Sequence, residues 1–424
     1  MKKTIICVFL IILMCSAVFA KTIDKVEYPE LEKEFAFQPT MARYDAMGQS
    51  GIATPTKIDS FFANPANLAV KRGFGFTVPS VSLTVYNLYN MVRDEEAMES
   101  FNKIVDGTAD DSEITSFAIK YLNSLGSGRN IIAKIDTGFG LQLGSLGLGT
   151  NVQVKLHTLN NGSSLASIKI IPEVNVAETL ALGLKVINTS SLSLSVGGSV
   201  HAVYKAYFEG IGGNTAVSFM DGSDPTDVLL WQTPVMGGFA IPFDVGATLG
   251  LMDDSLLISA TANNLNGTYH MQSFAGAGHL INSLQEDAIE VPEEYSESGE
   301  TVRFDVKTPW TLNFGVAFAP KWKIIQPVIT ADLVDMLEMV QNYDKDTFRA
   351  EDLLLHLNLG AELGLFNIVK ARVGINRGYM SVGACVRLLL AEVDVSYGWQ
   401  EFGVELGDKP VDSLTVKVVL GYDK

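Results

Sequence analysis

The residues that most often carry chemistry are present, but they are not arranged as a catalytic or metal site. The five histidines show neither H-x-x-x-H nor H-E-x-x-H spacing and predict no zinc site. They are His157, His201, His270, His279 and His356. The sequence contains no G-x-S-x-G nucleophile motif, and the glycine-rich stretch Gly144–Thr150 lacks the lysine of a phosphate-binding loop. We therefore expect no enzyme, no cofactor and no bound metal.

Four basic residues are candidates for contact with the carboxylate of a ligand. Lys155, Arg372, Arg387 and Lys417 each occupy a polar position in a run that alternates polar and apolar residues. If those positions face an enclosed lumen, each cation can form a charge-assisted hydrogen bond with a carboxylate. The other interpretation is structural pairing within the lumen. The acids at matching positions are Glu362, Glu392 and Asp394.

Strands must position these charges, and the clearest strand pattern fills residues 353–422. Runs such as His356–Leu365, Lys370–Asn376 and Ser381–Arg387 alternate polar or glycine with apolar residues, and very short turns join them. Successive side chains of a strand point to opposite faces, so each run has one polar and one apolar face. A soluble β-sandwich shares this pattern, with the apolar face inward. Charges spaced among glycines on the polar face favour an outer-membrane β-barrel with a wet lumen.

The start of the chain and its composition indicate export. A basic beginning, the apolar stretch Ile5–Met14 and a Val-Phe-Ala site predict a signal peptide of residues 1–20, with lipidation at Cys15 as the less favoured alternative. Beyond it only Cys385 remains, so we expect no intramolecular disulfide. Mean hydropathy is +0.21. No later apolar run approaches the ~20 residues of a membrane-spanning helix, so the hydropathy favours strands in lipid.

The charge balance limits the partners. The chain has 31 basic and 48 acidic residues and a net charge of −17. A surface this acidic argues against nucleic acid as a partner.

Several segments interrupt the strand pattern. Residues 88–125 have helical spacing and predict short helices outside the membrane, and residues 209–232 and 270–307 predict long loops. The strand pattern slips near Pro79, which predicts a kink or a bulge. Amphipathic aromatic residues near strand ends predict interfacial girdles. They are Trp310, Phe318, Trp322, Tyr397, Trp399 and Tyr422.

Two short motifs near the start of the chain suggest a family. Residues 42–53 read A-R-x-x-x-M-G-x-x-G-x-A, and residues 62–69 read F-x-N-P-A-x-L-A. This pair resembles the N-terminal signature of the FadL-like outer-membrane barrels, nearest to their spirochaete group, and PorV-like and TraF-like barrels share parts of it. The bridge Thr54–Asp59 departs from the aspartate-rich form that is frequent in the family.

The resemblance implies an all-β fold: a transmembrane antiparallel β-barrel of about fourteen strands with short helices in its loops. It places an N-terminal hatch segment at residues 21–72, folded inside the barrel mouth, and the barrel at residues 73–424. The residues expected to matter for gating are Met47, Gly48, Gly51, Asn64 and Pro65. Turn geometry alone is the alternative explanation for the glycines and the proline.

The function that follows from the resemblance is passive uptake of hydrophobic compounds, with long-chain fatty acids as the expected ligand. In that case Lys155, Arg372, Arg387 or Lys417 would meet the fatty-acid carboxylate. The alternative is a PorV-like barrel that binds or shuttles protein partners at its loops. Expected partners are a hydrophobic small molecule and the lipids of the outer membrane.

Overall fold

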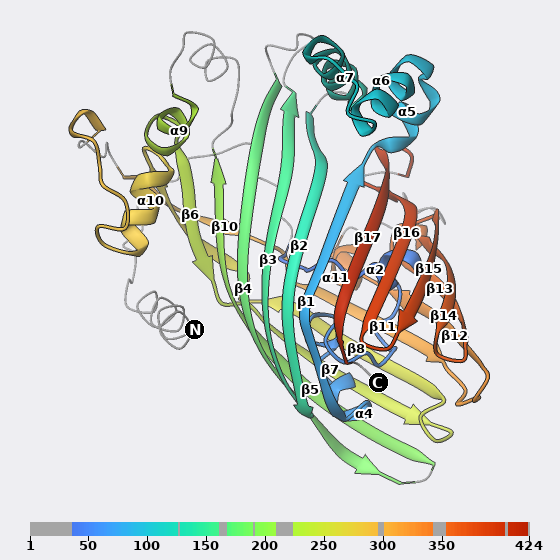
Figure 1. Ribbon diagram of the computed structural model, residues 1–424. Helices are drawn as coiled ribbons and strands as arrows, with labels where there is room; N and C mark the ends of the chain where they lie inside the picture. The colour runs from blue at the N-terminus through green and yellow to red at the C-terminus, as the bar shows by residue number, and fades with distance from the viewer. Residues whose placement is uncertain are drawn as a thin grey trace.

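The structure is a computed structural model, and it describes residues 36–125, 128–160, 168–189, 191–208, 224–295, 301–341, 353–402 and 406–422. The expected signal peptide and residues 21–35 of the expected hatch lie outside the described residues. One antiparallel sheet dominates the molecule and curves round until its two ends meet (Figure 1).

The sheet closes because β1 pairs with both β2 and β17. Its strands are β1 (Gly73–Tyr86), β2 (Gly128–Gly144), β3 (Leu146–Asn160), β4 (Ile168–Asn188), β5 (Leu192–Phe208), β6 (Val235–Ala240), β7 (Phe243–Leu251), β8 (Leu256–Leu265), β9 (Thr268–Phe274), β10 (Arg303–Lys307), β11 (Thr311–Phe318), β12 (Ile325–Leu333), β13 (Leu357–Leu365), β14 (Val369–Asn376), β15 (Tyr379–Leu388), β16 (Ala391–Glu401) and β17 (Pro410–Tyr422). A closed sheet leaves no edge, which is the condition for strands to cross a bilayer.

The seventeen strand segments form fourteen continuous strands of the barrel wall. β5 pairs with β7 along its first part and with β6 along its last, so β6 and β7 are two pieces of one strand. In the same way, β8 and β9 are two pieces of one strand, and β10 and β11 are two pieces of the next. Three interrupted strands reduce seventeen segments to fourteen. The predicted strand number is therefore confirmed.

The two faces of the wall have the polarity of a membrane barrel. On β14 the side chains of Val373 and Ile375 are exposed on the outside, whereas Arg372 and Asn376 are buried inside. The other strands of residues 353–422 repeat this arrangement, so the predicted lumen-facing register is confirmed there. The predicted irregularity near Pro79 is also present, as a shift of register between Thr77 and Ser80.

The barrel wall is tall on one side and low on the other. β1 to β5 have 14 to 21 residues, whereas β12 to β16 have 8 to 11. Figure 1 shows the long strands at the centre and the short, red and orange strands beside them. Short turns join the strands at one end of the barrel, which we call the short-turn end, and longer connections lie at the opposite long-loop end.

The helices lie mainly at the long-loop end. α5 (Leu88–Arg93), α6 (Glu95–Val105) and α7 (Asp111–Ser124) follow β1, as predicted for residues 88–125. α9 (Pro225–Asp227), the π-helical turn Val228–Gln232 and α10 (Ala277–Leu284) lie beside β6 (Figure 1). A short turn at Glu293–Tyr295 and α11 (Met336–Gln341) are further helical segments between strands. Among the described residues, no helix has both the length and the apolar character that crossing a membrane requires.

One sequence-based expectation was wrong in part. Residues 270–307 were expected to form a loop, but the segment contains most of β9, all of β10 and α10. The strand expected at about 236–250 is also broken, between Ala240 and Phe243. β9 and β10 were missed because they are short, with seven and five residues.

The first described part of the chain, residues 36–72, lies inside the barrel, and we call it the inner segment. It contains α2 (Ala42–Ala46), α3 (Ser60–Ala63) and α4 (Asn67–Val70). Figure 1 shows α2 and α4, in blue, within the curve of the sheet. β1 begins directly after it, at Gly73.

Candidate functional site

Two close contacts of the inner segment depend on glycine, one against the wall and one within the segment itself. Gly48 has φ +65°, and a Cβ atom there would lie 2.5 Å from the backbone of Ile375 on β14. Its N–H donates to Ser381 Oγ at 2.9 Å. Gly51 has φ +148°, and a Cβ there would lie 2.6 Å from the ring of Tyr44. The sequence motif around Met47, itself buried, is therefore a close-packing device as well as a turn.

Buried carboxylates on the wall receive backbone N–H groups of the inner segment. Asp332 accepts hydrogen bonds from the N–H of Gly51 at 2.6 Å and of Ile52 at 3.0 Å. On the opposite side, Asp136 accepts from the N–H of Thr40 at 3.1 Å. Each buried N–H that finds a charged acceptor avoids a desolvation cost of about 1–3 kcal/mol. Sequence reasoning missed both aspartates, because inward-facing acids of the wall cannot be assigned to a contact without the strand register.

The Asn-Pro-Ala turn is fixed by a small amide network. Asn64 Nδ2 donates to Ile52 O at 3.1 Å and to Thr248 Oγ1 at 3.0 Å. Thr248 Oγ1 in turn donates to Asn67 Oδ1 at 2.9 Å. Pro65 lies against Gly197 of β5, where a Cβ would be 2.6 Å from the Pro65 carbonyl oxygen. The five residues expected to matter for gating thus all lie in the packed contact between inner segment and wall.

An ion pair connects the inner segment to β13, and further pairs link β13, β14 and β16 within the wall. Arg43 binds Glu362 through two contacts, Nε to Oε2 at 2.9 Å and Nη2 to Oε1 at 3.1 Å. Arg372 Nε donates to the same carboxylate at 2.7 Å, and its Nη1 binds Asp394. We call these four residues the balanced cluster, because two cations meet two carboxylates. The Arg372 side chain is only 1% exposed, so it is fully engaged in structural pairing.

A charged cavity of about 230 Å³ lies between the inner segment and the wall near the short-turn end. Its basic lining residues are Arg43, Lys71, Lys370, Arg387 and Lys417, and its acidic ones are Asp59, Glu362, Glu392 and Asp394. Two expected ligand contacts therefore reach this cavity. Arg387 pairs with Glu392, and Lys417 Nζ donates to Thr40 O at 2.7 Å. The lining is too polar to hold a long apolar chain on its own.

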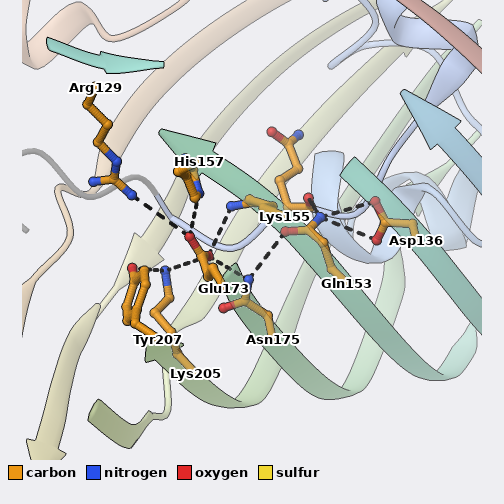
Figure 2. Close-up of polar contacts among 10 residues, drawn as sticks. Arg129, Asp136, Gln153, Lys155, His157, Glu173, Asn175, Lys205 and Tyr207 are labelled. Atoms are coloured by element: carbon orange, nitrogen blue, oxygen red, sulfur yellow. Dashed lines mark hydrogen bonds and ion pairs between the residues drawn. The ribbon is translucent and has the colours of Figure 1, made fainter. Parts of the chain in front are cut away.

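The fourth expected contact, Lys155, belongs to a separate group of charges on β2 to β5. Figure 2 shows Glu173 at the centre of this group. Its carboxylate lies 2.8 Å from His157 Nε2 and 3.3 Å from the Nζ atoms of both Lys155 and Lys205. Arg129 is 3.9 Å away. We call these five residues the shared-acid cluster, because one buried carboxylate serves several bases.

An apolar patch adjoins the shared-acid cluster inside the barrel. Lys205 Nζ lies 5.3 Å from the ring centre of Tyr207 and 5.0 Å from that of Tyr269, as a cation–π contact. Both tyrosines belong to a buried apolar cluster that joins the wall to the inner segment, and we call it the apolar inner cluster. Its larger members are Phe37, Phe61, Phe62, Leu68, Ile171, Val203, Tyr207, Met236, Tyr269, Met271 and Val306. Alternation along a strand predicts which of its residues face the lumen. It does not predict that the apolar residues of the wall and of the inner segment pack together in one cluster.

One group of side chains has metal-like spacing. Ligand atoms of Cys385, Glu392 and Asp394 lie within 4.8 Å of one another. Arg387 and Arg372 already bind the two carboxylates, so the donors are neutralised by protein cations and we assign no ion to them.

The closed sheet, its apolar exterior and its polar lumen define a transmembrane β-barrel of the outer-membrane type with a segment of chain inside it. No protein-family model matches the sequence. No curated protein matches it either.

Several solved barrels are similar to this chain. The Pseudomonas putida toluene transporter TodX is 12% identical, with 92% of this chain and 99% of that chain covered and a TM-score of 0.43. The Ralstonia pickettii toluene transporter TbuX is 14% identical over 93% and 98%, with a TM-score of 0.42. A Pseudomonas aeruginosa FadL homologue is 12% identical over 92% and 99%, with a TM-score of 0.42. The barrel class stated above depends on this chain's own strand pairing and side-chain faces.

Proposed function

We propose that this protein is an outer-membrane channel for the passive uptake of hydrophobic compounds, with the inner segment as its hatch. The observation that carries the proposal is the apolar inner cluster. Among the described residues, it is the largest apolar cluster in a lumen whose wall is otherwise mostly polar, and it runs from the long-loop side to Phe37, Phe61 and Phe62 of the inner segment. Such a cluster suits a water-insoluble molecule.

Long-chain fatty acids are the proposed ligand, because the apolar inner cluster adjoins the shared-acid cluster. An acyl chain could lie along Tyr207, Tyr269 and Met271 while its carboxylate meets Lys155. Lys155 already shares Glu173 with other bases, so its charge is only partly matched by that carboxylate. Arg387 and Lys417, which line the charged cavity at the short-turn end, suit a later contact on the way out. Arg372 suits a supporting role, because Glu362 and Asp394 occupy it.

The inner segment is proposed to gate the channel through its packed contact with the wall. Met47, Gly48 and Gly51 fit closely against β14 and Tyr44, and Asn64 and Pro65 fit against β7 and β5. Passage of a ligand requires these contacts to rearrange. The structure contains no nucleotide-binding motif among its described residues, and the proposed movement follows the concentration gradient.

Ligand titration tests the proposal. The barrel, folded in detergent and checked by heat-shifted gel mobility, is titrated with a fluorescent long-chain fatty acid and then with oleate. The proposal predicts saturable binding that oleate displaces. A folded barrel that binds neither lipid would contradict it and favour the protein-handling alternative.

A further inference from the structure

Three neighbouring strands of the wall are interrupted at about the same place. The breaks are Ile241–Pro242, Asn266–Gly267 and Thr308–Trp310. Hydrogen bonds connect two of them: Asn264 Nδ2 donates to Thr308 Oγ1 at 2.8 Å, and Thr308 Oγ1 donates to Gly267 O at 2.7 Å. The breaks form one line across the wall, and we call it the break line.

On the short-turn side of the break line, β8 and β11 have the polarity of a membrane barrel. The outward side chains of Ile258, Phe314 and Val316 are about 42–43% exposed. The inward side chains of Ser259 and Thr261 are buried. Lipid on the outside and a polar lumen satisfy both faces.

On the long-loop side of the break line the polarity is reversed. β9 and β10 present His270, Asp305 and Lys307 outward, all exposed, and the side chains of His270 and Asp305 lie 2.8 Å apart. Inward they present Tyr269, Met271 and Val306, which are at most 7% exposed. This is the pattern of a soluble sheet with one face in water. Facing hydrocarbon, a lysine on the outer face of a barrel costs up to about 2–4 kcal/mol.

Neighbouring elements agree with a boundary at the break line. Trp310, within the line, is 41% exposed, as expected of an aromatic residue at a membrane interface. The outer face of β6 is covered by protein, because Leu280 of α10 packs against Gly237. Figure 1 shows β6 next to α9 and α10.

We infer that the bilayer ends at the break line, and that β9 and β10 stand beyond it as a soluble-type wall with water outside and an apolar binding face inside. Resting on the proposed function, this assigns the apolar binding face, formed by Tyr269, Met271, Phe304 and Val306, to a hydrophobic molecule that arrives from water rather than from the surrounding lipid.

The position of the boundary can be tested without any ligand. In a Cys385→Ala background, Asp305→Cys on β10 and Val316→Cys on β11 place matched outward cysteines on the two sides of the break line. Each is labelled with bimane, and the barrel is reconstituted with brominated lipids. We expect strong quenching of the label at position 316 and at least threefold weaker quenching at position 305. Equal quenching would overturn the inferred boundary.

Binding to the apolar face is tested separately with N-phenylnaphthylamine, an uncharged apolar fluorophore. Met271→Glu places a charge on the inner face, and Gln272→Glu places the same charge on the outer face of the same strand. We expect at least tenfold weaker binding for Met271→Glu and a change below twofold for Gln272→Glu. Equal binding by the two variants would refute the assigned face. Failure of the unaltered protein to bind the probe would count against the proposed function and leave the quenching result standing.

Discussion

The balanced cluster and the shared-acid cluster are both buried in the lumen, but their charges are matched differently. In the balanced cluster, two arginines meet two carboxylates: Arg43 and Arg372 both bind Glu362, and Arg372 also binds Asp394. The Arg43–Glu362 pair joins the inner segment to the wall. In the shared-acid cluster, the carboxylate of Glu173 lies within 3.9 Å of basic atoms of Lys155, Lys205, His157 and Arg129. Equal numbers of cations and carboxylates favour a structural role for the balanced cluster, whereas the several bases around Glu173 are the reason for proposing that a ligand's carboxylate binds there.

Removing a shared carboxylate from the balanced cluster should have the largest effect. Glu362→Ala leaves two buried guanidinium groups with one carboxylate fewer between them, and breaking a buried pair costs about 3–5 kcal/mol. Urea unfolding of the reconstituted barrel measures this loss. Glu96→Ala is the matched control, because the Glu96 side chain is 83% exposed where it pairs with Lys120. Similar midpoints for the two variants would refute the structural role of the balanced cluster.

The second largest effect should come from the contact between the inner segment and β14. Gly48→Ala adds a methyl group where φ is +65° and the backbone of Ile375 is 2.5 Å away. The left-handed backbone costs about 1–2 kcal/mol and the overlap about 1–3 kcal/mol more.

Gly107 provides the control for this substitution. It has φ +68°, but a Cβ there meets nothing within 4 Å, so Gly107→Ala shows the backbone cost alone. Protease sensitivity of the inner segment should rise for Gly48→Ala and stay unchanged for Gly107→Ala. A protected inner segment in Gly48→Ala would show that the close contact with the wall is dispensable.

A third prediction separates binding from structure. Lys155→Met should weaken fatty-acid binding about tenfold, as expected for loss of one charge-assisted hydrogen bond of ~1.4 kcal/mol, with little change in unfolding. Arg372→Met should do the reverse and lower stability, because it strips the partner from Glu362 and Asp394. Fluorescence titration and urea unfolding of both variants measure the two effects. If Lys155→Met binds normally, the shared-acid cluster has no role in recognising the ligand.

The smallest effect should come from charges outside the membrane. Lys103 Nζ donates to Glu113 Oε1 at 2.7 Å, and this bond, with the N–H of Asp110, holds the pKa of Glu113 below its ordinary value of 4.5. A lowered pKa in the folded state stabilises the fold above pH 4.5, and that contribution is lost as the pH falls through the folded-state value. Limited proteolysis of α6 and α7 should therefore speed up below pH 4.5, and less so in Glu113→Gln. Identical pH profiles for the unaltered protein and Glu113→Gln would show that the Lys103–Glu113 pair does not stabilise α6 and α7.

The sequence predicted the regular part of the fold better than the irregular part. Strict alternation in residues 353–422 was sufficient for the lumen-facing positions of Glu362, Arg372 and Asp394, because short turns fix the register. β9 and β10 were missed, because they have only seven and five residues and so give a short alternating run within a segment rich in acidic and loop-forming residues.

The residues of the candidate site also divide into those that a local motif predicts and those that require the strand register. Gly48, Gly51 and Asn64 were found from a local motif, and each makes the close contact that its residue type permits. Glu173, Asp136 and Asp332 were not found, because their roles depend on which distant strands lie next to them. For Arg372 the sequence left two interpretations, a ligand contact or structural pairing with lumen acids, and the structure shows it paired with Glu362 and Asp394.

The most direct test of gating is to lock the inner segment to the wall. A Cβ built on Gly315 lies 3.1 Å from Cβ of Ile52, slightly closer than the 3.5–4.5 Å of a disulfide, and 2.5 Å from Asp332 Oδ1. A small shift of these side chains lets Ile52→Cys with Gly315→Cys form a disulfide in a Cys385→Ala background. Thr84→Cys with Thr415→Cys joins β1 to β17 within the wall and serves as control.

The measurement is uptake of a labelled long-chain fatty acid by cells in which this barrel is the outer-membrane route. If the inner segment gates passage, oxidation should reduce uptake at least tenfold in the Ile52–Gly315 pair, a reductant should restore it, and the wall control should not respond. Equal uptake by the oxidised and reduced Ile52–Gly315 barrel, with the disulfide shown to be formed, would contradict the account.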